Sequence, residues 1–127
     1  MSENLEQLVS TAQAMVAPGR GILAIDESMG TIKKRFDSVG VENSEQNRLD
    51  YRSMMLTADG LGEHISGAIL FDETIRQFTP DGQRLVDAMN AAGVLPGIKV
   101  DKGAKALAGF EGEKVTEGLD GLRERLA

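Results

Sequence analysis

Three short apolar runs, each ending in charged residues, dominate the pattern of hydrophobic and polar positions along this chain. They lie at residues 21–26 (GILAID), 65–72 and 97–101. Short apolar runs bounded by turn residues are typical of buried β-strands. The longer stretches between them repeat apolar residues at helical spacing. Strands separated by helices predict βαβ units, so we expect an α/β fold with a parallel sheet.

The helical stretches have recognisable ends. A first helix is expected before Pro18 and Gly19, and Gly93 is a natural stop for a later one. Ser44 is a candidate N-cap, and a short basic helix is predicted in SMGTIKKRFDSVG after the first strand. The apolar residues expected to pack are Leu5, Leu8, Val9, Ala12 and Met15 in the first helix, Leu49, Met54, Met55 and Leu56 after Ser44, Leu85, Val86 and Met89 before Gly93, and Leu119, Leu122 and Leu126 in a last helix.

The composition describes one soluble globular unit and narrows the choice of partners. The chain has 127 residues, of which 41% are hydrophobic and 27% are charged, and its net charge is −6. This acidic balance argues against a general nucleic-acid binder and against binding to an anionic membrane. The sequence has no cysteine and one histidine, which excludes disulfides, thiol catalysis and a histidine-rich metal site. It shows no signal peptide and no apolar stretch of roughly 18 residues, so a cytoplasmic location is expected.

The charged ends of the three runs are candidates for a ligand site, because the βα loops gather at the C-terminal ends of parallel strands. Asp26 is there either as a buried structural carboxylate or as a catalytic acid or base. Lys99 and Asp101 are two residues apart, so they share one face of the third strand. Lys99 is either the ion-pair partner of a neighbouring carboxylate, or a phosphate ligand or amine nucleophile. Spacing alone leaves these alternatives open.

The stretch SMGTIKKR at residues 28–35 is a candidate phosphate site. Gly30, the hydroxyl of Thr31 and the N-terminus of the following helix suit an anion. The alternative is an ordinary basic helical turn in contact with solvent. The pattern by itself does not exclude that alternative.

Longer strings are more specific than these spacings. The blocks GRGILAIDES.GTIKKRF, VEN...NR..YR, ILFDETI.Q, GVLPGIKVDKG and GLDGL stand in this order along nearly the whole chain. In order and spacing they resemble the N-terminal part of class I fructose-bisphosphate aldolase. The resemblance implies a (β/α)8 TIM barrel, of which this chain would supply about the first three β/α units.

The resemblance also implies an activity. Members of the family are lyases of glycolysis and gluconeogenesis that reversibly cleave fructose 1,6-bisphosphate into dihydroxyacetone phosphate and glyceraldehyde 3-phosphate. They use no metal and no cofactor, because a lysine amine forms a Schiff base with the ketone and the protonated imine withdraws electrons from the breaking C–C bond. The implied partners are small sugar phosphates, and the family's common homotetramer implies a homo-oligomer.

Site residues carry over by motif. Asp26 in AIDES is similar to the family's aspartate for proton transfer, and Lys99 in GIKVDKG to its substrate-contacting lysine. Ser28, Thr31 and Arg35 match positions associated with phosphate contacts, and Asp101 lies at the same strand end as Lys99. Under this resemblance Asp26 is best interpreted as an active-site carboxylate. Met29, where the common form has threonine, leaves the hydroxyls of Ser28 and Thr31 in place.

The length is the main departure from the family. A family member is more than twice as long as these 127 residues, so residues 1–127 are expected to be the N-terminal part of a single barrel domain. The Schiff-base lysine, a glutamate acid/base and a later phosphate loop are expected beyond Ala127, so the isolated chain is expected to be inactive. Three parallel strands also leave an exposed edge. The alternative is a stand-alone partial barrel that binds phosphorylated sugars or a partner chain without catalysis.

Overall fold

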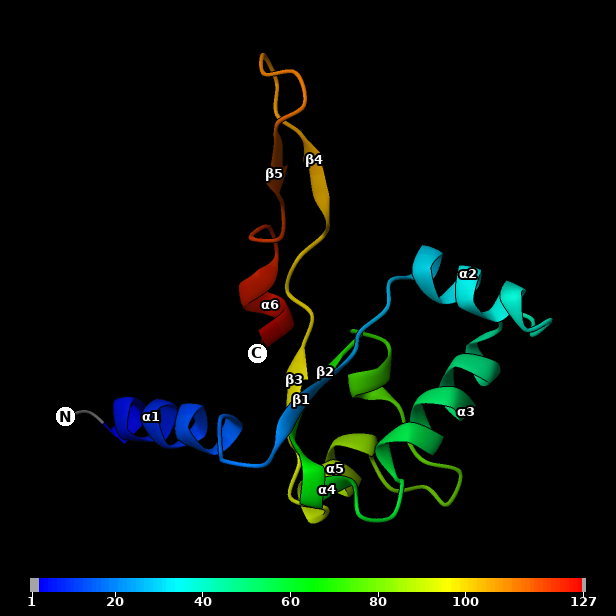
Figure 1. Cartoon of the computed structure of the whole chain (residues 1–127), viewed down its shortest axis with the longest axis vertical. Helices are drawn as coiled ribbons and strands as arrows, with labels where there is room; N and C mark the ends of the chain where they lie inside the picture. Colours follow the sequence, from blue (N-terminus) through cyan, green and yellow to red (C-terminus); the bar gives the residue numbers. More distant parts are fainter. Residues whose placement is uncertain (1–2, 127) are drawn as a thin grey trace.

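The computed structural model describes residues 3–126, which form a three-stranded parallel sheet, a set of helices and a separate antiparallel hairpin (Figure 1). The parallel strands β1 (Gly21–Ile25), β2 (Ile65–Leu70) and β3 (Leu95–Ile98) lie side by side in that order. The hairpin pairs β4 (Ala104–Ala106) with β5 (Lys114–Thr116) and extends away from the sheet. The α/β class expected from the alternating pattern is therefore confirmed.

Helices connect and flank the parallel strands. They are α1 (Glu3–Met15), α2 (Met29–Ser38), α3 (Glu45–Leu56), α4 (Leu61–His64), the 3-10 turn η1 (Thr74–Arg76), α5 (Leu85–Ala91) and α6 (Leu122–Leu126). Two predicted helix ends are confirmed. The Ser44 hydroxyl accepts a hydrogen bond from Asn47 N at 3.2 Å and so caps α3. Gly93 follows α5 with φ +73°, a conformation that glycine adopts without a steric cost.

The register of the sheet determines which residues meet at its C-terminal edge. Ile25 pairs with Leu70, and Leu70 pairs with Ile98. The ladder continues one residue further, because Lys99 N donates a hydrogen bond to Leu70 O at 2.8 Å. Asp26 follows Ile25 and Lys99 follows Ile98, so both lie just past the last paired residues of their strands. Two predicted site residues from distant parts of the sequence therefore lie at the same edge of the sheet.

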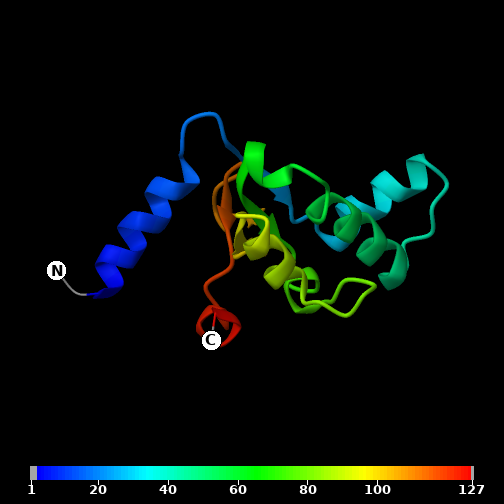
Figure 2. The ribbon, with the colours of Figure 1, turned by 90° about the horizontal axis from the view of Figure 1, so that it is seen from below.

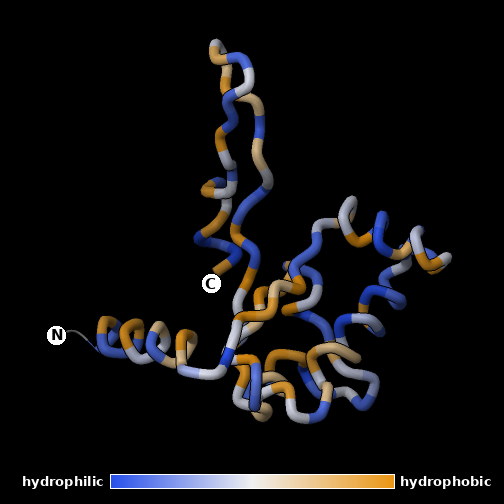
Figure 3. The backbone as a smooth tube through the Cα atoms, viewed as in Figure 1, coloured by the Kyte–Doolittle hydropathy of each residue, from blue (hydrophilic) through white to orange (hydrophobic). Residues whose placement is uncertain are grey.

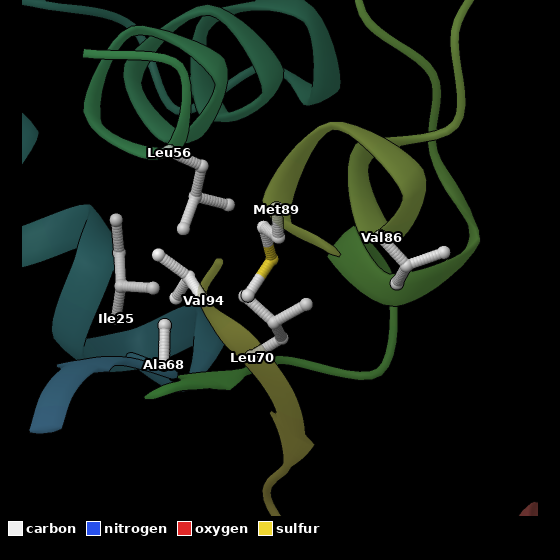
Figure 4. Close-up of a cluster of buried hydrophobic side chains, with 7 residues drawn as sticks. All are labelled: Ile25, Leu56, Ala68, Leu70, Val86, Met89 and Val94. Carbon is white, nitrogen blue, oxygen red and sulfur yellow. The ribbon is translucent and has the colours of Figure 1, made fainter. Parts of the chain in front are cut away.

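The hydrophobic core lies between the sheet and the helices α3 and α5 (Figure 4). It joins strand residues to Leu56 of α3 and to Val86 and Met89 of α5. The strand and loop contributors are Ile25, Ala68, Leu70 and Val94. Successive strand residues alternate between faces, so the residues next to these point to the other side of the sheet. That second side faces the site described below.

Helix α1 lies apart from this core. It projects from the sheet on the side away from α2 and α3 (Figure 2). Apolar and polar residues alternate along it (Figure 3), as its predicted apolar face requires, but none of its described residues is buried. The predicted helix is confirmed, whereas the expected packing of Leu5, Leu8 and Val9 is not present in the described residues.

Three sequence-based boundaries were wrong. The second strand ends at Leu70, and the third runs over Leu95–Ile98 instead of 97–101. Proline is tolerated at 96 because β3 lies at an edge of the described sheet, where an absent N–H costs no ladder bond. The hairpin β4–β5 was not predicted.

The predicted last helix, which was expected to include Leu119, was also too long. Helix α6 begins at Leu122, and Leu119 lies outside it with 87% of its surface exposed. Met54 is likewise exposed, while the buried face of α3 carries Arg48 and Arg52. Among the described residues, no helix is long and apolar enough to cross a membrane.

Candidate active site

A pocket of about 730 Å³ opens at the C-terminal ends of the three parallel strands. It brings together all six site residues predicted from the sequence, namely Asp26, Ser28, Thr31, Arg35, Lys99 and Asp101. Its wall also includes Ala24, Glu27, Phe71, Asp72, Lys102, Gly103 and Arg125. Ala24 and Asp26 are two residues apart along β1, so both reach the pocket from the face of the sheet opposite the core.

Lys99 is the centre of an ion-pair cluster in this pocket. Its Nζ lies 2.5 Å from Asp101 Oδ1 and 3.5 Å from Asp26 Oδ2. The hydrogen bond to Asp101, and then the charges of both aspartates, raise the pKa of Lys99 above its ordinary value despite partial burial. The same hydrogen bond lowers the pKa of Asp101. At neutral pH Lys99 is therefore a cation held between acidic side chains.

Hydroxyl and guanidinium groups line the side of the pocket next to α2. The Ser28 and Thr31 hydroxyl oxygens lie 3.2 Å apart at the N-terminus of the helix. Ser28 is in the N-cap position, yet its hydroxyl bonds to the Thr31 hydroxyl and makes no capping hydrogen bond to the helix backbone, so this pair of hydroxyls keeps hydrogen-bonding capacity for a ligand. The first N–H groups of a helix have no intrahelical partner and favour an anion. Arg35 completes this side, and its Nη1 donates a hydrogen bond to Glu27 Oε1.

A buried network of arginines and glutamates lies beneath the pocket. Arg48 makes two hydrogen bonds to Glu73, at 2.8 Å from Nε and 2.6 Å from Nη2. Arg52 is fully buried; its Nη1 lies 3.4 Å from Glu73 Oε2, and its Nη2 donates to Glu27 O at 3.0 Å. Arg52 also lies over the Phe71 ring at 5.5 Å. Helix α3 thereby binds the loops that follow β1 and β2.

The pKa shifts in this network follow from pairing and burial. The hydrogen bond to Arg48 lowers the pKa of Glu73, and the reciprocal bond raises the pKa of Arg48. Burial lowers the pKa of Arg52, although the charges of Glu27 and Glu73 oppose this shift. Glu73 is therefore ionised at neutral pH and neutralises buried positive charge.

Asp72 joins the pocket to the end of the described chain. Its Oδ1 accepts a hydrogen bond from Arg125 Nε at 3.3 Å, and its Oδ2 lies 3.5 Å from Arg76 Nε. Burial raises the pKa of Asp72, but the two arginines together outweigh burial and the pKa is lowered. Arg125 Nη2 also donates to Lys99 O at 2.7 Å. Helix α6 is thus held against the ends of β2 and β3.

Sequence reasoning missed the residues that support the site. Arg48, Arg52 and Leu56 are spaced by four, so they share one face of a helix, and the structure shows that this face is buried. Two arginines on a buried face require acidic partners. The repeated Asp–Glu ends of the first two strands supply them. This spacing was the available signal, but the apolar residues of α3 were given more weight.

Among residues 3–126, no group of three or more histidine, aspartate or glutamate side chains is placed to hold a metal ion. The described pocket instead presents a protonated amine, carboxylates, hydroxyls and a guanidinium. These groups can bind a phosphorylated, hydroxylated compound and can exchange protons with it.

Comparison with known proteins gives consistent matches. A family model described as "Glycolytic: Fructose-bisphosphate aldolase class-I" matches residues 7–127. A "Probable fructose-bisphosphate aldolase class 1" of Xanthomonas axonopodis pv. citri is 66% identical over 123 residues, which are 97% of this chain and 37% of the relative. "Fructose-bisphosphate aldolase 1" of Toxoplasma gondii is 56% identical over 97% of this chain and 34% of its own length.

A solved structure shares the fold. It is the fructose-bisphosphate aldolase of Plasmodium falciparum, in complex with TRAP and a small-molecule inhibitor, and it is 48% identical with a TM-score of 0.92. The match covers 98% of this chain and 36% of that one. The chain thus spans somewhat more than a third of the length of the relatives it matches.

Proposed function

Because this chain belongs to the family of class I fructose-bisphosphate aldolases, we propose that it forms the N-terminal part of a Schiff-base aldolase. The proposed reaction is the reversible cleavage of fructose 1,6-bisphosphate into dihydroxyacetone phosphate and glyceraldehyde 3-phosphate. In this proposal residues 1–127 supply the first three strands of a (β/α)8 barrel, and the remaining strands come from further chain. The proposed substrates and products are small sugar phosphates.

One observation supports this assignment more than any other. The six predicted site residues come from two separate segments, residues 26–35 and 99–101, and line a single pocket at the C-terminal ends of parallel strands. In α/β proteins this edge is where ligands bind, because the βα loops meet there. Residues 26–35 and 99–101 are far apart in the sequence, so their meeting in one cavity supports a shared role in binding a ligand.

We assign Lys99 to substrate binding. Its raised pKa keeps the amine protonated at neutral pH, and a protonated amine is not a nucleophile. An ammonium beside a pocket suits an anionic oxygen of the substrate. The imine-forming lysine is therefore proposed to lie elsewhere, in further chain beyond residue 127.

We assign Asp26 to proton transfer. Its carboxylate reaches the pocket from the end of β1 and lies 3.5 Å from Lys99 Nζ, so one oxygen remains for a substrate hydroxyl. A positioned carboxylate can accept the proton of a hydroxyl as the neighbouring C–C bond breaks. Asp101 is proposed to hold Lys99 in place, since its 2.5 Å contact is the shorter of the two.

We assign the α2 side of the pocket to one phosphate of the substrate. Ser28, Thr31 and Arg35 offer two hydroxyls and a guanidinium at a helix N-terminus. Phosphate oxygens accept hydrogen bonds from each of these groups, and the helix dipole favours their charge. Lys99 can contact the same substrate from the other side of the pocket.

Borohydride trapping tests the division of roles. The 127-residue chain and the full-length gene product are each incubated with dihydroxyacetone phosphate and sodium borohydride, and adducts are located by peptide mass spectrometry. We expect a stoichiometric adduct only in the full-length protein, on a lysine outside residues 1–127. A stoichiometric adduct on Lys99 would overturn the assignment. The absence of any adduct in the active full-length protein would overturn the Schiff-base reaction itself.

A further inference from the structure

We infer that Glu27, a buried carboxylate that touches no substrate atom in the proposed reaction, positions Arg35 for phosphate recognition. This inference rests on the proposed function, because it concerns the same phosphate site. The sequence comparison assigned no role to Glu27. The contacts of its side chain indicate a positioning role.

Glu27 and Arg35 form an unequal pair. The Glu27 side chain is 5% exposed, whereas the Arg35 side chain is 59% exposed. An exposed arginine samples many rotamers, and fixing it on a ligand costs conformational entropy. A contact with an immobile carboxylate removes part of that freedom before the ligand arrives, which is the benefit of preorganisation.

The carboxylate of Glu27 is itself held by α3. Its Oε1 also accepts a hydrogen bond from the Tyr51 hydroxyl at 3.2 Å, and Arg52 Nη2 lies 3.8 Å from its Oε2. Arg52 is fully buried and additionally binds the backbone oxygen of Glu27. The Tyr51 ring packs edge-to-face on Phe36 of α2, with centroids 6.0 Å apart. Glu27 thus links the buried side chains of α3 to the exposed Arg35 of α2.

The geometry of the contact leaves Arg35 able to bind an anion. The bond to Glu27 uses Nη1, and a guanidinium carries five N–H donors in a planar fork. Arg35 lines the pocket together with Ser28 and Thr31, so its other donors are available on that side. The Glu27 carboxylate therefore orients the Arg35 guanidinium and leaves its other N–H donors free to bind an anion.

Charge and positioning predict opposite effects of Glu27→Gln on the affinity for phosphate. A carboxylate next to an anion site repels the anion, so by charge alone Glu27→Gln should strengthen phosphate binding. Positioning predicts the reverse, because the uncharged amide holds the guanidinium weakly. The direction of the change therefore separates the two effects without reference to its size.

Inorganic phosphate is the probe, titrated into the full-length gene product and followed by ¹H–¹⁵N TROSY NMR shifts of residues 28–35. We expect Glu27→Gln to weaken binding by roughly fivefold, the size of one lost hydrogen bond. Arg35→Gln should weaken it by about tenfold or more, because a charged donor is lost. Adding Glu27→Gln to Arg35→Gln should cause no further loss, since Glu27 acts through Arg35.

Asp37→Asn is the matched control. Asp37 also pairs with a basic residue of α2, Lys33, at 2.6 Å, but both side chains are more than half exposed. The substitution also removes one negative charge that pairs with a basic residue of α2, so we expect phosphate binding to stay unchanged or to tighten slightly. Comparing the amide spectra of the unliganded variants shows whether each keeps the wild-type fold.

A second measurement follows the steady-state kinetics of the same full-length gene product. There Glu27→Gln should raise KM for fructose 1,6-bisphosphate with little change in kcat, since binding and not chemistry is affected. Tighter phosphate binding by Glu27→Gln, or equal losses with and without Arg35, would overturn the positioning role alone. Wild-type binding that Arg35→Gln does not weaken would overturn the proposed phosphate site as well.

Discussion

An Asp–Glu pair follows each of the first two strands, yet the aspartates and the glutamates have different surroundings. The side chains of Asp26 and Asp72 are 24% and 39% exposed and line the pocket. Those of Glu27 and Glu73 are 5% and 22% exposed and face the arginines of α3. Asp26 and Glu27 directly follow β1 and alternate between the two sides of the sheet, whereas Asp72 and Glu73 lie in the turn that leads from β2 into η1.

This difference shows that carboxylates next to one another in the sequence can have different roles. The glutamates neutralise Arg48 and Arg52, which would otherwise be buried charges without partners. The aspartates face cations that solvent and substrate can also reach. We therefore expect Glu73 on the glutamate side to control stability and Asp26 on the aspartate side to control chemistry, and the following substitutions test that division in the full-length gene product.

The largest expected effect is on stability, from Glu73→Gln. This change leaves buried Arg48 without a charged partner and Arg52 with only its 3.8 Å contact to Glu27, and breaking a buried ion pair typically costs about 3 to 5 kcal/mol. Urea denaturation monitored by circular dichroism measures the change in the free energy of unfolding. A loss of less than about 1 kcal/mol, the value of a surface ion pair, would show that the network is not structurally important.

Asp26→Asn should have the largest effect on the reaction. It keeps the shape of the side chain but removes its charge and most of its proton affinity, so turnover should fall by at least roughly 10²-fold. Stability should change little, because functional sites often hold charges that the fold does not need. Turnover and the urea midpoint are measured on the same variant. Near-normal turnover combined with a loss of several kcal/mol would make Asp26 a structural carboxylate, like the glutamates.

The pH dependence of the free energy of unfolding should show the contribution of ionised Glu73. The hydrogen bond from Arg48 lowers the folded-state pKa of Glu73 below the unfolded value of about 4.3. Its contribution is complete above that unfolded pKa and is lost as the pH falls through the folded pKa. Wild-type protein should therefore lose stability more steeply than Glu73→Gln between about pH 5 and pH 3. Parallel curves for the two proteins would contradict this assignment.

The smallest effect is expected for Asp72→Asn. Arg76, one of its two partners, is 61% exposed on its side chain, and exposed ion pairs contribute less than about 1 kcal/mol. The free energy of unfolding should change within that range, in contrast to Glu73→Gln one residue away. A loss as large as that of the glutamate variant would remove the distinction between the two sides.

Much of the site was predictable because it depends on local pattern and on the rules for parallel sheets. The alternating pattern indicated parallel strands, whose C-terminal ends collect ligand residues, and this was sufficient to single out Asp26 and Lys99. Ser44 as a cap and Gly93 as a stop are equally local, since capping and positive φ depend on a few neighbouring residues. The hairpin β4–β5 was not predictable from the same signals, because its strands are three residues long and fully exposed.

The sequence by itself determined the family resemblance, the class of fold and which residues reach the C-terminal edge, because these depend on string identity and on a period of two along each strand. Only the tertiary structure decided the partners of those residues. Lys99 meets Asp26 across 73 positions of sequence, and Glu73 meets Arg48 across 25. Such pairs depend on sheet register and on the face that α3 presents to the sheet. Both are set by how the whole core packs, a property that no single segment contains.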